Sequence, residues 1–262
     1  MSRAQYLHLI SVEPSTGQVR IAAESKEAAY GRGRPAVRLT SKTAFTTGLF
    51  VIDVNHIPEG NATWPAFWSF GPNWPYSGEI DIVEGRNDQP NNQSTLHTNP
   101  GCVMPTPDAS RMTGKFIESL NCNFADGHKG CTTQGPESSF GPGLNHLGGG
   151  VFAMLWTTSS ISIWHWARQN IPANITSGAP PDPTQWGLPT SYFQLGANCP
   201  AKHFLNHHLV LNTTFCGEWA GPTFRGPTGH GIDACNSYVS HNPKMFADAY
   251  WDINYIHAYS VP

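Results

Sequence analysis

The sequence predicts an all-β domain, an antiparallel sandwich, and three observations support this fold class. Apolar residues make up 39% and charged residues only 13% of the 262-residue chain. Gly occurs 26 times and Pro 22 times, so turns are frequent. Between these turns, short segments rich in β-branched and aromatic residues recur, as strands of a sandwich do. These segments are Gln18–Ala22, Pro35–Thr40, Gly48–Val54, Val151–Thr157, Ile161–Trp166, His208–Phe215 and Trp251–Tyr259. A chain of this length can form one large all-β domain, so we expect residues 1–262 to be a single domain.

Two further regions complete the expected architecture. Residues 99–150 are rich in Gly, Pro, Asn and Ser and carry few strand patterns, so we expect long surface loops there. One short helix is expected after Asn242, which can cap it. Pro243 suits the first helical position, and Lys244–Ala249 continue the helix.

Charge and pattern exclude several classes of function. The net charge of −3 gives no electrostatic footprint for nucleic acid or for an anionic membrane surface. The sequence has no basic run, no internal repeat and no apolar stretch long enough to span a bilayer. Gly148–Gly150 lead into a strand without a phosphate-loop pattern. We therefore expect no nucleic-acid or membrane partner, and a monomer.

Three carboxylates stand close together in the β-prone stretch Glu79–Glu84. Side chains alternate between the two faces of a strand, so Glu79 and Asp81 share one face. Strict alternation would send Glu84 to the other face, but one extra residue, a β-bulge, would bring it back. Ile80 and Ile82 can then pack into a core behind the acids.

Three acids at one surface are crowded enough to separate their pKa values. One can stay ionised, one can hold a proton, and the middle one can tune its neighbour. Two carboxyl groups in such roles are what glycoside hydrolysis requires. The alternatives are an acidic, solvated strand face and a Ca²⁺-binding cluster.

Tryptophan is concentrated just before the acidic stretch. The chain has nine Trp residues, and Trp64, Trp68 and Trp74 precede Glu79 closely. Trp64 and Trp74 are each followed by Pro, in sequence that looks like loop. Indole faces can stack on the apolar faces of pyranose rings, so we expect Trp68 or Trp74 to contact sugar.

These segments carry a resemblance to a known family. Trp64–Trp68, Trp74–Pro75, Gly78–Gly85 and Leu96–Thr98 resemble glycoside hydrolase family 16, and most closely its fungal laminarinase-type endo-β-1,3(4)-glucanases. The later segments Phe215–Gly221, Asn242–Pro243 and Ala249–Ile253 agree. The resemblance runs in order from about residue 10 to the end of the chain.

The resemblance implies a concanavalin A-like jelly roll with a sugar cleft across its concave face. Relatives begin some tens of residues earlier, with a strand of the sandwich. We therefore expect this chain to be truncated at the N-terminus and its first strand to be missing. Met1–Tyr6 do not look like a signal peptide, although the family implies a secreted parent protein.

The resemblance also implies roles for the three acids. Glu79 matches the nucleophile, Glu84 the general acid/base and Asp81 the helper carboxylate between them. The implied mechanism is double displacement with retention, for which the two Glu carboxyl groups should lie roughly 5–5.5 Å apart.

Five further residues match substrate-binding positions of the family. His97 matches a histidine beside the catalytic acids. Trp68, Trp74 and Trp219 match aromatic residues along the glycone side of the cleft. Arg34 matches a glycone-side arginine.

The implied activity is endo-hydrolysis of β-1,3-glucan, and of β-1,4 links beside β-1,3 ones. Two alternatives remain open: a catalytically silent glucan-binding protein, and a transglycosylase that remodels cell walls. Relatives of the second kind tend to carry the unbulged pattern E-x-D-x-E, whereas this chain has the extra residue.

No cofactor and no metal ion is expected. His203, His207 and His208 cluster in sequence, but adjacent residues of a strand point to opposite faces and cannot converge on one ion.

Cysteines and glycosylation sequons favour an oxidised, secreted protein. The six cysteines include no C-x-x-C pair, and fifteen pairings are possible. Pairing by loop length suggests Cys122–Cys131, Cys199–Cys216 and, by remainder, Cys102–Cys235. Sequons occur at Asn61, Asn92, Asn174 and Asn212, the last in an expected strand where a glycan fits poorly.

Overall fold

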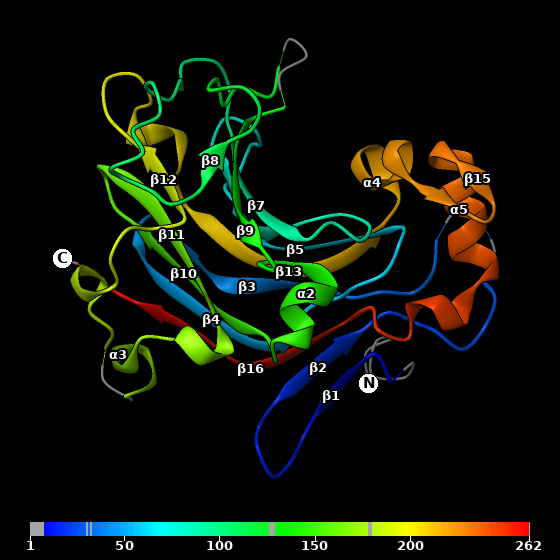
Figure 1. Ribbon diagram of the computed structural model, residues 1–262. Coiled ribbons are helices and arrows are strands. Elements are labelled where there is room, and N and C mark those ends of the chain that lie inside the picture. Colours follow the sequence, from blue (N-terminus) through cyan, green and yellow to red (C-terminus); the bar gives the residue numbers. More distant parts are fainter. Residues whose placement is uncertain (1–7, 30, 32, 126–128, 178–179, 262) are drawn as a thin grey trace.

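The computed structural model describes residues 8–29, 31, 33–125, 129–177 and 180–261. These residues form two seven-stranded antiparallel sheets packed face to face, as Figure 1 shows. The outer sheet contains, in spatial order, β1 (Ile10–Val12), β2 (Val19–Ala22), β16 (Tyr250–Tyr259), β4 (Gly48–His56), β10 (Gly150–Trp156), β11 (Ser160–Ala167) and β12 (Ser191–Gln194). The cleft sheet contains β3 (Arg38–Phe45), β13 (His207–Phe215), β5 (Thr63–Phe70), β6 (Glu79–Glu84), β7 (Asn91–His97), β9 (Cys131–Glu137) and β8 (Lys115–Phe116). The predicted all-β sandwich is confirmed.

The strand predictions are accurate where apolar and β-branched residues dominate. Six of the seven predicted strands match observed ones to within two residues at each end. The seventh, Pro35–Thr40, is displaced, because the observed strand begins at Arg38 and continues to Phe45. Its side chains are mostly exposed, so burial gives its boundaries little sequence signal.

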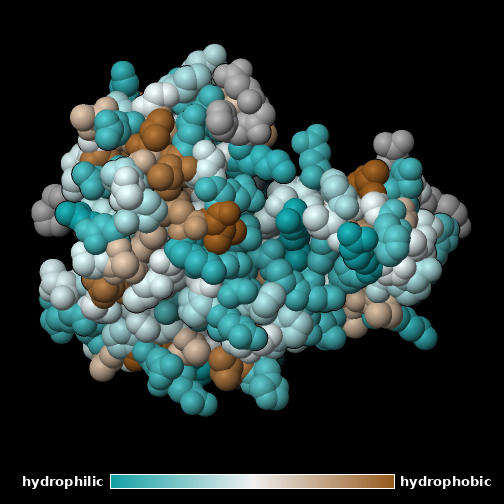
Figure 2. Space-filling view, turned by 45° about the horizontal axis from the view of Figure 1, so that its top comes forward, coloured by the Kyte–Doolittle hydropathy of each residue, from teal (hydrophilic) through white to brown (hydrophobic). Residues whose placement is uncertain are grey.

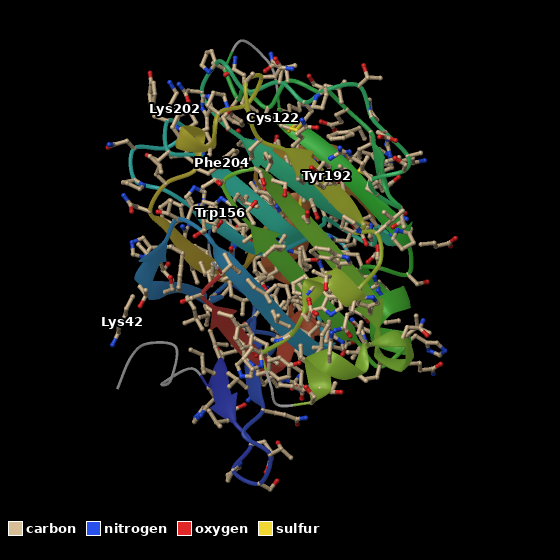
Figure 3. All side chains as sticks on the ribbon, turned by 90° about the vertical axis from the view of Figure 1, so that its left-hand side faces the viewer. Lys42, Cys122, Trp156, Tyr192, Lys202 and Phe204 are labelled. Atoms are coloured by element: carbon tan, nitrogen blue, oxygen red, sulfur yellow. A yellow bond between two sulfur atoms is a disulfide. The ribbon has the colours of Figure 1, made fainter. Side chains whose placement is uncertain are left out.

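The main core lies between the two sheets. Phe50 and Ile52 of β4 meet Ile80 and Ile82 of β6 there, and all four are at most 1% exposed. Burying one such side chain stabilises the fold by roughly 1.5–3 kcal/mol. In Figure 3, Trp156 lies inside the molecule; its ring packs on the ring of His207, with centroids 4.9 Å apart.

Two expectations about the loops are wrong, the first of them in part. Residues 99–125 are mostly loop, as expected, but residues 131–146 contain strand β9 and helix α2 (Gly141–His146). Gly135 and Pro136 are uncommon inside strands, so the sequence pattern did not predict β9. Its first residues are nevertheless buried, and the strand pairs with β7. Trp64 and Pro65 lie inside strand β5, not in a loop.

The C-terminal helix is shorter than expected, and a longer one precedes it. Pro243–Phe246 form a single 3₁₀ turn, and the Asn242 side chain donates to the Tyr238 carbonyl and does not cap the turn. Helices α4 (Gly217–Thr223) and α5 (Gly231–His241) flank the small hairpin of β14 (Arg225–Gly226) and β15 (Gly229–His230). Together they form a lobe at one end of the cleft sheet, here called the α4–α5 lobe (Figure 1). The described residues also form α3 (Ala173–Thr176) and three more 3₁₀ turns, at Arg168–Asn170, Pro183–Gln185 and Ala201–His203.

All six cysteines are paired. The disulfides are Cys102–Cys199, Cys122–Cys131 and Cys216–Cys235. The pairing of Cys122 with Cys131 is confirmed, and the other two predicted pairs, Cys199–Cys216 and Cys102–Cys235, are wrong. Loop length could not reveal them, because the fold brings the loop after β7 beside the loop after β12, and α4 beside α5.

Two of the four sequons lie in strands. Asn92 is 4% exposed, and its amide nitrogen donates to backbone and hydroxyl oxygens. Asn212 lies on β13, and its side chain lines the cleft described below. A glycan at either position would disrupt packing or fill the cleft. Within the described part of the chain, no helix has both the length and the apolar character needed to cross a bilayer.

Candidate active site

The expected β-bulge is present in β6. On the β5 side, Phe67 pairs with Val83 and Trp68 with Asp81, so Ile82 is the extra residue. On the β7 side, Asp81 pairs with Thr95, and the next pair is Glu84 with Gln93. Ile82 and Val83 are both buried in the core. Because two consecutive side chains point inward, the next one, Glu84, points to the cleft, as Glu79 does.

Each of the three acids has a specific partner at the surface of the cleft sheet. The indole N–H of Trp74 donates to Glu79, and that of Trp64 donates to Oε1 of Glu84 over 2.7 Å. Asp81 is 1% exposed, and its Oδ2 lies 3.3 Å from Nε2 of His97.

Burial is the main cause of high pKa values in all three acids. It raises the pKa of Glu79 to about 8, with the charge of Asp81 as the second cause. It raises the pKa of Glu84 to about 7, against the opposing effect of the Trp64 N–H. Burial and the charge of Glu84 hold the pKa of Asp81 well above its usual range. Each of the three acids therefore holds a proton more readily than a free carboxyl group does.

A cleft of about 420 Å³ opens beside Glu79 and Glu84. Its walls come from β3, β5, β6 and β13 and include Trp64, Trp68 and Asn212. Figure 2 shows the molecule hollowed between its larger left-hand part and the α4–α5 lobe on the right, with a mostly hydrophilic rim.

One wall of the cleft presents an aromatic ring held between polar groups. The Trp68 indole N–H donates to Oδ1 of Asn212 over 2.6 Å. The Arg38 guanidinium carbon lies 4.8 Å from the Trp68 ring centroid, a cation–π contact. Ring, amide and guanidinium are the groups that bind the faces and hydroxyls of a sugar.

Trp219 supports the Glu84 end of the site. Its ring meets the Trp64 ring edge-on, with centroids 5.4 Å apart. The Arg86 guanidinium lies 4.4 Å from the Trp219 ring centroid and donates to the Trp219 carbonyl over 2.8 Å. Gly217 has φ of +58°, and an added Cβ there would lie 3.0 Å from Cζ3 of Trp64.

Trp74 and His97 meet at the Glu79 end through Phe124. The ring centroids of Trp74 and Phe124 are 4.7 Å apart, and those of His97 and Phe124 are 5.6 Å apart. Trp74 is 42% exposed, which leaves part of its indole face available to a ligand.

The expectation for Arg34 is wrong. Its side chain is fully buried and forms an ion pair of 2.8 Å with Glu24. The guanidinium also donates twice to the Val239 carbonyl, at 3.1 and 2.7 Å. Arg34 therefore ties the N-terminal segment to α5 and does not line the cleft.

Sequence reasoning missed Arg38, Asn212, Phe124 and Arg86. Asn212 lies on a predicted strand between buried Leu211 and Thr213, which was the available signal, whereas Arg38 lies on the mostly exposed strand β3 and gave none. Phe124 and Arg86 follow no periodic pattern, because they lie in irregular segments.

One set of possible metal ligands coincides with the acids. Among the described residues, ligand atoms of Glu79, Asp81 and His97 lie within 4.8 Å of one another. His203, His207 and His208 instead bond to separate partners, Asn99, Ser77 and Ser41.

Comparison with protein families gives a match over nearly the whole chain. Residues 1–259 match the model described as the XgeA-like, catalytic GH16 domain. An endo-1,3(4)-beta-glucanase of Arthroderma benhamiae is 40% identical over 268 residues, covering 98% of this chain and 57% of that protein. A probable endo-1,3(4)-beta-glucanase of Aspergillus flavus is 42% identical over 241 residues, covering 89% of this chain and 35% of that protein. This chain thus spans between about a third and three fifths of the length of these two relatives.

Solved structures with the same fold span two activities. An elongating GH family 16 beta-1,3-glucosyltransferase superposes with a TM-score of 0.90 at 36% identity, covering 99% of this chain and 89% of that one. Laminarinase 16A from Phanerochaete chrysosporium, solved with 6-O-glucosyl-laminaritriose in its donor and acceptor sites, superposes with a TM-score of 0.89. It is 38% identical and covers 99% of this chain and 88% of its own.

Proposed function

Because the chain belongs to glycoside hydrolase family 16, we propose that it is an endo-acting glucanase that hydrolyses β-1,3-glucan with retention. The substrate range includes mixed β-1,3/1,4-glucan. Residues 1–262 act as a single catalytic domain and work as a monomer in an oxidising, extracellular environment, which the three disulfides favour.

The observation that carries the proposal is the bulged strand β6. It places Glu79, Asp81 and Glu84 at one surface, and two of them border a cleft lined by indole rings. Each of the two Glu side chains accepts an indole N–H, which fixes its orientation without adding a positive charge. Buried carboxyls that share protons are suited to acid and base roles at neutral pH.

In the first step, Glu84 donates its proton to the glycosidic oxygen while a Glu79 oxygen attacks the anomeric carbon. The bond from that carbon to the leaving sugar breaks, and a glycosyl ester on Glu79 forms. Glu84 begins this step protonated because burial raises its pKa to about 7.

In the second step, the Glu84 carboxylate removes a proton from water, and the water oxygen attacks the anomeric carbon. The ester to Glu79 breaks, and Glu84 regains its proton. Glu79 must be ionised in the first step. Of Glu79 and Asp81, we assign the proton to Asp81, because burial and the charge of Glu84 hold its pKa well above its usual range, while the Trp74 N–H favours the charged form of Glu79.

Substrate binding is assigned to the aromatic walls. Trp68 and Trp74 offer faces for stacking, and Asn212 and Arg38 offer polar contacts to hydroxyl groups. His97 acts through Asp81, whose carboxyl group it contacts over 3.3 Å and holds in place. Trp219 acts by supporting Trp64.

A second candidate function is transglycosylation. It is favoured by the likeness to the glucosyltransferase, whose TM-score matches that of the laminarinase. The same glycosyl-enzyme would serve both reactions, since a sugar hydroxyl can replace water in the second step. A silent glucan-binding protein is disfavoured because neither glutamate is replaced.

Product analysis on three polysaccharides tests these candidates. Linear β-1,3-glucan, mixed-linkage β-glucan and cellulose are incubated with the protein, and reducing ends and product lengths are followed. Shorter oligosaccharides from the first two, and none from cellulose, are expected. Products longer than an added laminarioligosaccharide would indicate transfer, and binding without any cleavage would refute catalysis.

A further inference from the structure

The bulge in β6 leaves backbone groups of this strand without their regular hydrogen-bond partners on β7. Between Asp81 and Glu84 the ladder to β7 is interrupted, and Ile82 and Val83 are buried. A bulged residue is left out of the regular ladder. Buried backbone groups beside it must then find other partners, because leaving them unpaired is costly.

One side chain of β7 satisfies both sides of the interruption. Nδ2 of Asn92 donates to the Ile82 carbonyl over 3.0 Å. Oδ1 of Asn92 accepts from the Glu84 backbone N–H, also over 3.0 Å. The carboxamide thus spans the bulge, with one end on the extra residue and the other on Glu84 itself.

Asn92 is itself held firmly. It is 4% exposed, and its backbone N–H donates to Oγ of Ser139 over 2.8 Å. That N–H is free to do so because the pairing of β7 with β9 shifts register at this level, between Asn91 and Gln93. Ser94 adds a second donor to the Ile82 carbonyl, at 3.0 Å.

Residue type matters at this position. Asn carries a donor and an acceptor on one planar carbon. Asp in its ionised form has no donor for the Ile82 carbonyl, and Ala has neither group. The Asn92 amide is buried, and both its nitrogen and its oxygen are hydrogen-bonded to β6. The Asn of this N-x-S sequence therefore contributes to the interior of the sheet.

We propose that Asn92 is a positioning residue for the general acid/base Glu84, an inference that rests on the proposed function. Glu79 and Asp81 precede the bulge and keep their own register with His97 and Thr95. Loss of the Asn92 bridge therefore changes the position of Glu84 relative to Glu79, and not the position of Glu79 in the sheet.

The consequence is a selective loss of proton transfer. A sugar leaving group needs the proton of Glu84, whereas a dinitrophenolate leaving group does not. For both substrates, kcat/KM reports the steps up to cleavage of the glycosidic bond. A defect in Glu84 alone is thus visible as a difference between the two.

The test compares Asn92→Ala with wild type on a laminarioligosaccharide and on the 2,4-dinitrophenyl glycoside of the same glycone. The expected loss in kcat/KM is on the order of 10²-fold on the oligosaccharide, as for a misplaced catalytic group, with little change on the aryl glycoside. Ser94→Ala is the matched control, because it removes a donor to Ile82 and the 3.3 Å contact with the Asn92 amide but leaves the Asn92 bonds to Ile82 and Glu84; it should stay close to wild type on both substrates. Glu79→Ala should lose activity on both.

Equal losses of Asn92→Ala on both substrates, or no loss on either, would overturn the positioning role. If the variant does not fold, Asn92→Leu carries the same comparison, because it keeps nearly the same shape, adds no charge and removes both the donor to Ile82 and the acceptor for the Glu84 N–H. If wild type cleaves neither substrate, the proposed function fails, and the inference fails with it.

Discussion

Replacing Glu84 by Gln should make the stability of the protein less dependent on pH. The pKa of Glu84 is about 7 in the folded protein, against an ordinary value of 4.5, and burial is the main cause. Below pH 4.5 the group is protonated in both the folded and the unfolded state. As pH rises from 4.5 to 7, the unfolded state releases this proton first, so the free energy of unfolding falls.

The size of this effect follows from the two pKa values. At 1.36 kcal/mol for each unit of pKa, the complete difference corresponds to about 3 kcal/mol, most of which is lost between pH 5 and pH 8. For a chain of this length, that corresponds to a difference in Tm of about 5–10 °C. Gln keeps the acceptor for the Trp64 N–H, so the variant should lose the charge and little else.

The assay is the Tm of both proteins at pH 5 and pH 8. Glu84→Gln should melt increasingly above wild type as pH rises. Glu218→Gln, the same change at an exposed carboxyl on α4, is the matched control and should follow wild type. If wild type and Glu84→Gln lose stability in parallel between pH 5 and pH 8, the argument from burial is refuted.

Three further predictions follow from the site. Glu79→Ala should lower kcat on β-1,3-glucan by roughly 10⁴-fold or more while glucan binding persists; wild-type turnover would contradict its role as nucleophile. Gly217→Ala should lower the free energy of unfolding by about 1–2 kcal/mol because of the positive φ at this position. It should also lower kcat, because the added Cβ displaces the Trp64 ring; thermal melting and enzyme kinetics measure the two effects. Arg34→Ala should reduce stability by about 3 kcal/mol with KM unchanged, because it breaks a buried ion pair whose two residues do not line the cleft; a raised KM in a stable protein would restore a role for Arg34 in binding.

The sequence predicts the acidic strand well because two independent rules apply to it. Alternation places Glu79 and Asp81 on one face, and the need to return Glu84 to that face requires a bulge, which the pairing with β5 and β7 contains. Apolar residues between the acids fix the inward face. Local pattern therefore determines local geometry here.

The sequence cannot reveal contacts that depend on distant segments. The Arg34 side chain looks available beside a turn, but it is buried by Glu24 and by Val239, more than 200 residues away. The bridge from Asn92 to Glu84 is equally invisible, because its purpose appears only once the register of β7 against β6 is known. The sequon pattern at Asn92 favours the opposite interpretation, an exposed surface position.

The strand order has a consequence for how the protein is made. β13 lies between β3 and β5, and β16 lies between β2 and β4, so each sheet is completed by a strand from late in the chain. The meander β5–β6–β7 can form from neighbouring segments as soon as they are synthesised. Until residues 207–215 have left the ribosome, however, β3 and β5 each present an open edge, which is a template for unwanted pairing. Such long-range closure is slow. The sheet edges therefore stay exposed after the acidic strand β6 has been synthesised and until the last strands are available. The yield of folded protein in a cell should then depend on chaperones that cover these edges.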